Sequence, residues 1–145
     1  MIPIRAVIFD FHATLVDQGD ADEWLDRAVA RAGAGLVLDE RDRETVTRRL
    51  DDIWVHAREI DPGSGRDLSA ANHREVVHGV MDGHVTDDLR HALYDVMLDL
   101  WRAYDEAPGV LSELRRRGMA TAILSNVGVD IRPVMAREGL VVDAV

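Results

Sequence analysis

The sequence of 145 residues contains no cysteine and no lysine, so all 17 of its basic residues are arginine. Without cysteine it has no disulfide framework, no thiolate nucleophile and no thiolate metal site. No apolar run approaches the roughly 20 residues of a membrane span, and the N-terminus lacks the basic-then-apolar form of a signal peptide. We therefore expect a cytoplasmic protein with no membrane partner. The net charge of −10 argues against nucleic-acid binding, because phosphate contacts need a basic face.

The sequence does contain two apolar runs that each end in polar residues. Residues 6–9 run into Asp10, and residues 119–124 run into Ser125 and Asn126. Runs of this length predict strands buried on both faces of a parallel α/β sheet. Right-handed crossovers bring the ends of such strands to one edge of the sheet, so Asp10 and Ser125 are expected to lie near each other. The alternative for Asp10 is a carboxylate that only caps the following turn.

Residues 17–103 predict a helical insertion, and residues 1–16 and 104–145 predict the α/β core that surrounds it. Four stretches of the insertion carry apolar stripes at helical spacing. We expect the insertion to pack largely on itself through Trp24, Trp54, Leu93 and Trp101. Its five histidines lack the spacing of a helical metal pair, so they are expected at the surface. They are His56, His73, His78, His84 and His91.

The α/β pattern resumes after the insertion. A short helix is expected to end at Arg115–Gly118, where basic residues and a glycine are stop signals. Asp130 is expected to cap a further helix that Gly139 ends, and residues 140–145 look like the approach to a third strand.

Residues Phe9–Leu15 resemble the first motif of the haloacid dehalogenase-like hydrolases, and Ile123–Asn126 resemble the second. The helical insertion resembles the cap that these enzymes carry after their first strand. The resemblance implies a Rossmann-like parallel sheet with an inserted α-helical cap. It also implies Mg²⁺ as cofactor and hydrolysis of a small-molecule substrate, most often a phosphate ester.

The resemblance also assigns roles to individual residues. Asp10 would be the nucleophile that attacks phosphorus or carbon, and Ser125 would donate a hydrogen bond to the transferring group. Thr14 and Asn126 would help to bind the phosphate. Magnesium would contact the Asp10 carboxylate and the backbone carbonyl of His12. The chemistry agrees, because a carboxylate nucleophile splits ester hydrolysis into two steps and Mg²⁺ offsets the repulsion between two anions.

His12 departs from the phosphatase pattern, which has a second aspartate at that position as general acid and base. Imidazole titrates near neutrality and can shuttle a proton, or the ring can simply fill the turn. The dehalogenase branch of the family also lacks an aspartate there. A 2-haloacid dehalogenase, which would form an ester on Asp10, is therefore the alternative to a phosphatase.

The second departure is that the family needs a lysine beside the nucleophile and acidic metal ligands after a later strand. This sequence has no lysine and ends before such a motif. We therefore expect a truncated form with an incomplete core, little or no turnover, and an unpaired sheet edge that favours homo-oligomers. A third possibility is a non-catalytic remnant that binds a ligand or a partner.

Overall fold

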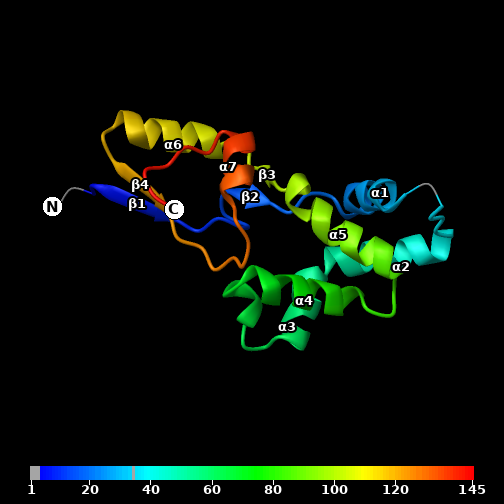
Figure 1. Ribbon diagram of the computed structural model, residues 1–145. Helices are drawn as coiled ribbons and strands as arrows, with labels where there is room; N and C mark the ends of the chain where they lie inside the picture. The colour runs from blue at the N-terminus through cyan, green and yellow to red at the C-terminus, as the bar shows by residue number, and fades with distance from the viewer. Residues whose placement is uncertain (1–3, 34) are drawn as a thin grey trace. The chain divides into compact units, whose positions relative to one another are not determined.

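The computed structural model describes residues 4–33 and 35–145, which form two compact units (Figure 1). The first unit comprises the described residues up to 18 together with 101–126 and 130–145. The second comprises the described residues of 19–100 together with 127–129. No helix in the described ranges is both long enough and apolar enough to cross a membrane.

The first unit is built on a small parallel sheet. Strand β1 (Ala6–Phe9) pairs with β4 (Ala120–Ile123), with Ala6 opposite Ala120 and Phe9 opposite Ile123. A single parallel bridge joins Ala144 to the other edge of β4. Helix α6 (Ala107–Arg116) lies along these strands, and α7 (Arg132–Glu138) belongs to the same unit (Figure 1). With the helices that follow β1, this confirms the predicted α/β fold with an inserted helical segment.

The prediction that residues 6–9 are buried on both faces is wrong. Ile8 is 65% exposed, and Ala6 is exposed as well. Successive side chains of a strand point to opposite faces, so a helix on one side of the sheet can cover only half of them. On one side of the sheet Thr121 and Ile123 are buried, and Val7 and Phe9 beside them are half-buried, while Ile8 on the other side is exposed.

Two short strands mark where the chain leaves the first unit and returns to it. Strand β2 (Val16–Asp17) pairs antiparallel with β3 (Arg102–Ala103), so that Val16 lies opposite Ala103 and Asp17 opposite Arg102. The sequence predicted helix up to residue 103, which is wrong at this end. Trp101 and Tyr104 continue the helical spacing of the apolar residues before them. A strand of two residues is too short to show the alternation of side chains by which a strand is predicted.

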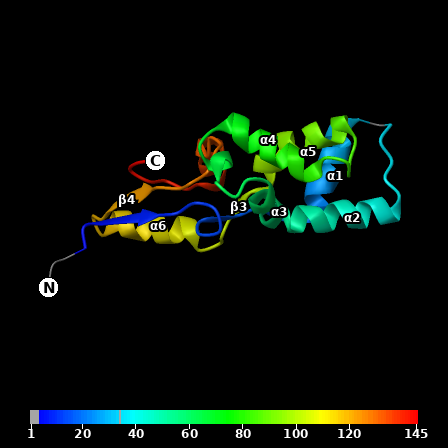
Figure 2. The ribbon, with the colours of Figure 1, turned by 90° about the horizontal axis from the view of Figure 1, so that it is seen from below.

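The second unit is helical. Three of its helices begin where a side chain accepts a backbone N–H, at Asp20, Asp39 and Ser69. Its elements are α1 (Ala21–Ala32), α2 (Glu40–Asp51), α3 (Ile53–Ile60), the 3₁₀ turn η1 (Gly65–Asp67), α4 (Ala70–Met81) and α5 (Asp87–Leu100). Helix α1 packs on α5 (Figure 2). The Trp24 indole donates a 2.9 Å hydrogen bond to the carbonyl of Leu93. Packing of this segment on itself through Trp24 and Leu93 is confirmed.

Other predictions for the insertion need correction. The apolar residues from Val46 to Ala57 lie on two helices, which separate at Asp52. Trp54 is half-buried and packs on His73 of the same unit, with ring centroids 5.7 Å apart. Trp101 is buried in the first unit, where its ring packs on Phe11 with ring centroids 6.1 Å apart. The spacing of apolar residues in the sequence does not show where a helix ends, because an apolar residue just beyond the end fits the same spacing.

His73 is buried, so the prediction that it lies at the surface is wrong. It is 2% exposed, and its ring lies 5.7 Å from those of both Trp54 and Tyr94. Burial, the largest cause, lowers its pKa; the charge of Asp67 opposes this shift and the charge of Arg66 adds to it, so that the pKa is about 4. His73 is therefore a neutral member of the aromatic core of this unit at pH 7.

Gly19 meets the end of α5 too closely for a side chain. Its φ is +82°, and a Cβ there would lie 2.7 Å from the carbonyl oxygen of Leu100. We expect Gly19→Ala to lower the free energy of unfolding by about 1–3 kcal/mol, measured by urea denaturation. Gly63→Ala is the matched control, because nothing lies within 4 Å of its Cβ position. Equal stability of the two variants would show that the backbone at Gly19 accommodates a side chain without strain.

Candidate active site

Asp10 and Ser125 meet where β1 and β4 end. The Leu124 amide donates to the carbonyl of Phe9 at 2.9 Å, which continues the ladder to the last residue before Ser125. The Ser125 hydroxyl donates a 2.6 Å hydrogen bond to Asp10 Oδ1, and the Phe11 amide donates to the same oxygen at 2.7 Å. The predicted proximity of the two side chains is confirmed. Within the described residues no hydrogen bond reaches Asp10 Oδ2, so one oxygen of the carboxylate is fixed while the other can react.

A tight turn follows Asp10, and its backbone amides donate hydrogen bonds to carbonyls of the same turn. The carbonyl of Phe11 accepts hydrogen bonds from the amides of residues 14, 15 and 16, and the Ala13 amide donates to the carbonyl of Val16. Ala13 has a φ of +58°, and the buried side chains of Phe11 and Leu15 hold the turn in the core. Because the amides of residues 13–16 already have partners, they are not positioned to bind the oxygens of a substrate anion.

The His12 ring packs against a tryptophan beside this turn. Its centroid lies 5.0 Å from the ring of Trp101. Burial, the largest cause, lowers the pKa of His12 below 6.5, while the negative charges of Asp17 and Asp10 oppose this shift. At pH 7 the imidazole is therefore mainly neutral, and the predicted part of His12 in proton transfer stays a prediction.

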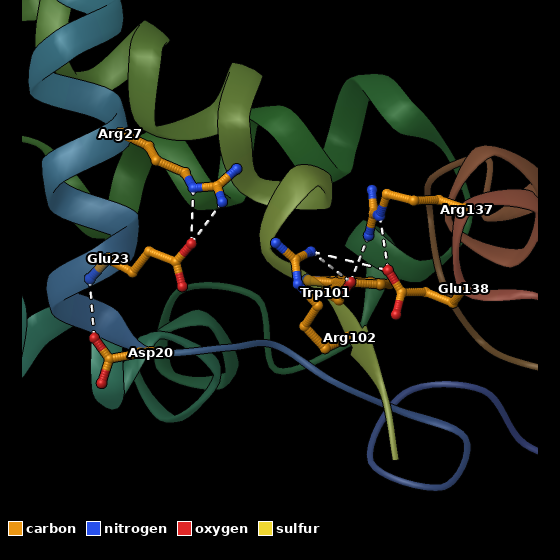
Figure 3. A network of polar contacts seen from close by, with 7 residues as sticks. All are labelled: Asp20, Glu23, Arg27, Trp101, Arg102, Arg137 and Glu138. Atoms are coloured by element: carbon orange, nitrogen blue, oxygen red, sulfur yellow. Dashed lines mark hydrogen bonds and ion pairs between the residues drawn. The ribbon is translucent and has the colours of Figure 1, made fainter. Parts of the chain in front are cut away.

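The end of α7 holds Trp101 and the strand after it. The Arg137 guanidinium donates to the carbonyl of Trp101 (Figure 3). Glu138 Oε2 accepts the Ala103 amide at 3.0 Å. Arg102 adds a 3.2 Å hydrogen bond to the same carbonyl. These contacts fix the residue that packs on His12. No sequence pattern linked residues 101–103 to residues 137 and 138, because the contact spans more than thirty positions without a periodic signal.

Thr14 and Asn126 are less closely tied to this site. Both residues are exposed. In the described ranges, no hydrogen bond joins either side chain to Asp10 or Ser125. Their predicted part in binding a phosphate therefore stays a prediction.

The residues near Asp10 do not make a metal site by themselves. Among residues 4–33 and 35–145, no group of three or more His, Asp or Glu side chains is placed to hold a metal ion. The predicted ligands are one carboxylate, that of Asp10, and the backbone carbonyl of His12. Because Mg²⁺ is usually held by oxygen ligands in a near-octahedral arrangement, these two groups are too few to define its position. We therefore assign no chemical step to a metal.

A solved structure shares this architecture. A crystal structure of a dehalogenase matches 97% of this chain and 61% of its own, with 23% identity and a TM-score of 0.53. The chain has the haloacid dehalogenase-like fold. A 2-haloacid dehalogenase from Pseudomonas syringae pv. Tomato DC3000 matches 90% of this chain and 58% of its own, at 21% identity and a TM-score of 0.43. No family model and no curated protein sequence matches the chain.

The chain thus spans about three-fifths of the length of each of these two dehalogenase chains. At such identity the likeness concerns the haloacid dehalogenase-like fold alone. The likeness therefore assigns no role to Asp10, Ser125 or their neighbours.

Proposed function

We propose that the protein is a hydrolase that uses Asp10 as a nucleophile. The observation that carries this proposal is the 2.6 Å hydrogen bond from the Ser125 hydroxyl to Asp10 Oδ1, formed at the ends of two parallel strands. Ligands of open α/β folds bind at this edge of the sheet. Ser125 and the Phe11 amide fix the carboxylate through one oxygen, and the other oxygen can attack an electrophile.

The surroundings of Asp10 suit a leaving group that needs no proton. A halide leaves as a stable anion, whereas the alkoxide of a phosphate ester needs an acid to protonate it. The His12 imidazole is a poor acid at pH 7, because burial lowers its pKa. The amides of residues 13–16 are paired within the turn and are not positioned to stabilise a phosphoryl dianion. A small organic halide, such as a 2-haloacid, is therefore the substrate class that the site supports best.

The proposed reaction has two steps. Asp10 Oδ2 attacks the carbon that bears the halogen, so a C–O bond forms and the halide departs with the electron pair of the C–halogen bond. Water next attacks the carboxyl carbon of the resulting ester. The product leaves as a hydroxy compound whose hydroxyl oxygen came from Asp10, and Asp10 regains a carboxylate with one oxygen from water. A proton passes to the solvent.

The name of the first similar structure agrees with this proposal, since that protein is called a dehalogenase. A Mg²⁺-dependent phosphatase is the alternative. The Ser125 hydroxyl favours it, because a hydroxyl beside the nucleophile suits a phosphoryl oxygen. The lack of lysine weighs against it, since no lysine can offset the charge of a phosphate dianion beside Asp10.

The test uses the 145-residue chain with 2-chloropropionate in H₂¹⁸O and, in parallel, with p-nitrophenyl phosphate with and without Mg²⁺. We expect chloride release that persists in the presence of EDTA, and ¹⁸O in the peptide that contains Asp10. The peptide that contains Asp105, an exposed carboxylate of the same unit, is the control and should stay unlabelled. We expect no Mg²⁺-dependent release of p-nitrophenol.

Two results would contradict this proposal. Mg²⁺-dependent release of p-nitrophenol without release of chloride would establish the phosphatase instead. If neither product forms and Asp10 gains no ¹⁸O, the chain is not a hydrolase of either class, and a binding role takes its place.

A further inference from the structure

Two histidines of the second unit lie ring to ring across neighbouring helices. Helices α4 and α5 lie side by side (Figure 2). The first carries His78 and the second carries His91. Their ring centroids are 4.8 Å apart, and the ring planes make an angle of 67°. The spacing rule for metal-binding histidines concerns two positions on one helix, so the sequence alone does not reveal a pair that two helices bring together.

One ring nitrogen of this pair is buried without a hydrogen bond. His78 is half-buried, and its Nε2 atom is covered yet has no hydrogen-bond partner among the described residues. A buried polar atom without a partner costs free energy, because it has lost its bonds to water and gained none. Such an atom in a native fold needs an explanation, and a bound ion is one.

His91 is prepared to bind a metal ion through its Nε2 atom. Its Nδ1 lies 2.7 Å from the carbonyl oxygen of Asp87, so Nδ1 carries the hydrogen of the neutral ring and donates it. Nε2 then holds the lone pair. Histidines that bind metals usually donate their other ring N–H in this way, which fixes the tautomer and the orientation of the ring. His91 is exposed, so an ion can reach it from the solvent.

The separation of the two rings fits an ion held between them. With Zn–N bonds of about 2.0–2.1 Å, the ion lies roughly 3.2 Å from the centre of each ring, so two rings at about 90–110° around it have centroids roughly 4.5–5.2 Å apart. The observed 4.8 Å lies within this range. Helices α4 and α5 therefore need not move apart to hold the ion.

We propose that His78 and His91 form a binding site for a divalent transition-metal ion such as Zn²⁺, which both rings hold through Nε2. Imidazole suits Zn²⁺, Cu²⁺ and Ni²⁺, whereas Mg²⁺ and Ca²⁺ prefer oxygen ligands. In the described ranges no third His, Asp or Glu is placed to complete the set of ligands. Water therefore fills the remaining positions, and the site is weaker than a structural zinc site with four protein ligands.

The charges around His78 set its protonation and the strength of the site. Burial, the largest cause, lowers the pKa of His78 below 6.5. Cationic side chains add to this shift, in the order His91, Arg90 and Arg74. Asp95 opposes it. The His78 ring is therefore mainly neutral at pH 7, as a metal ligand must be. Asp95 attracts the ion and the two arginines repel it, so we expect a Kd for Zn²⁺ on the order of 10–100 μM.

A second arrangement also fits two rings at 67°, in which an N–H of His78 points at the face of the His91 ring. In that case Nε2 of His78 carries the hydrogen and the ring contact satisfies it. Its lone pair is then not offered to a metal ion. Titration with a metal ion distinguishes the two arrangements.

The experiment is isothermal titration calorimetry with Zn²⁺ at pH 7, on the 145-residue chain without a histidine tag. We expect one ion per chain. His78→Gln and His91→Gln are each expected to weaken the Kd by about tenfold or more, because loss of a ligand costs at least as much as loss of a group that orients one. His84→Gln is the matched control, because His84 is exposed in the turn between the same two helices, and it should leave the Kd unchanged. Circular dichroism checks that the variants are folded.

Cu²⁺ bound to the wild type gives an answer without any substitution. Its electron paramagnetic resonance spectrum should show coupling to two imidazole nitrogens, and coupling to one or none would overturn the proposal. Zn²⁺ binding that His78→Gln and His91→Gln both retain would overturn it as well. A wild-type chain that binds no Zn²⁺ up to about 1 mM would also overturn it, and would assign Nε2 of His78 to the ring contact.

Discussion

Replacing Asp10 by asparagine is expected to lower the rate of substrate hydrolysis by about 10³-fold or more. The amide carries no charge and its nitrogen is not a nucleophile. The side-chain oxygen of asparagine can still accept the hydrogen bond that Ser125 now donates to Asp10 Oδ1, so the turn should keep its geometry. The measurement is the rate of halide release under single-turnover conditions, together with the free energy of unfolding.

Asp105→Asn is the matched control, because it removes an exposed carboxylate from the same unit. We expect that variant to keep the wild-type rate, and we expect both variants to unfold within about 1 kcal/mol of the wild type. Asp10→Asn with wild-type activity would exclude Asp10 as the nucleophile. Loss of activity in both variants would mean that charge in general, and not the nucleophile, was removed.

Acid is expected to destabilise the protein through His73 by about 3 kcal/mol between pH 7 and pH 4. Burial lowers the pKa of His73 to about 4, and a histidine in the unfolded chain titrates near 6.5. The unfolded state therefore binds the proton first as the pH falls. The stability from neutral His73 is fully present above pH 6.5 and is lost as the pH falls from about 6.5 towards 4.

His73→Phe is the comparison for this prediction, because phenylalanine keeps a ring between Trp54 and Tyr94 but does not titrate. Urea unfolding at pH 7, 5.5 and 4 should show a loss of stability that is about 3 kcal/mol larger in the wild type than in the variant. Carboxylates titrate in both proteins, so the difference reports on His73. Parallel curves for the two proteins would show that His73 is accessible to water.

The features that the sequence could predict are those that depend on local rules. The caps at Asp20, Asp39 and Ser69 follow from the residue types that accept a free backbone N–H. The meeting of Asp10 and Ser125 follows from the rule that parallel strands end at the same edge of a sheet. Each of these inferences needs only a short stretch of sequence and a statement about topology.

The features that it could not predict depend on which parts of the chain touch. Trp101 continues an apolar stripe, yet it packs on Phe11 and His12 after the helix has ended. His73 was expected at the surface because the histidines lack the spacing of a helical metal pair, yet its ring is buried among those of neighbouring helices. The side of the sheet on which Ile8 lies has the same apolar composition as a covered one, and only the three-dimensional arrangement shows that no helix described in the first unit covers it.

The pairing of β2 with β3 holds the two ends of the helical segment, residues 19–100, close together. Opposed residues in an antiparallel ladder are about 4.5–5.5 Å apart, so the chain leaves at Asp17 and returns at Arg102 at nearly the same point. A two-residue turn can join strands at that spacing, and so can any inserted domain whose own ends lie close together. Residues 19–100 can therefore be lengthened or replaced without moving the two points at which the chain leaves and rejoins the first unit, whether by genetic insertion or by design.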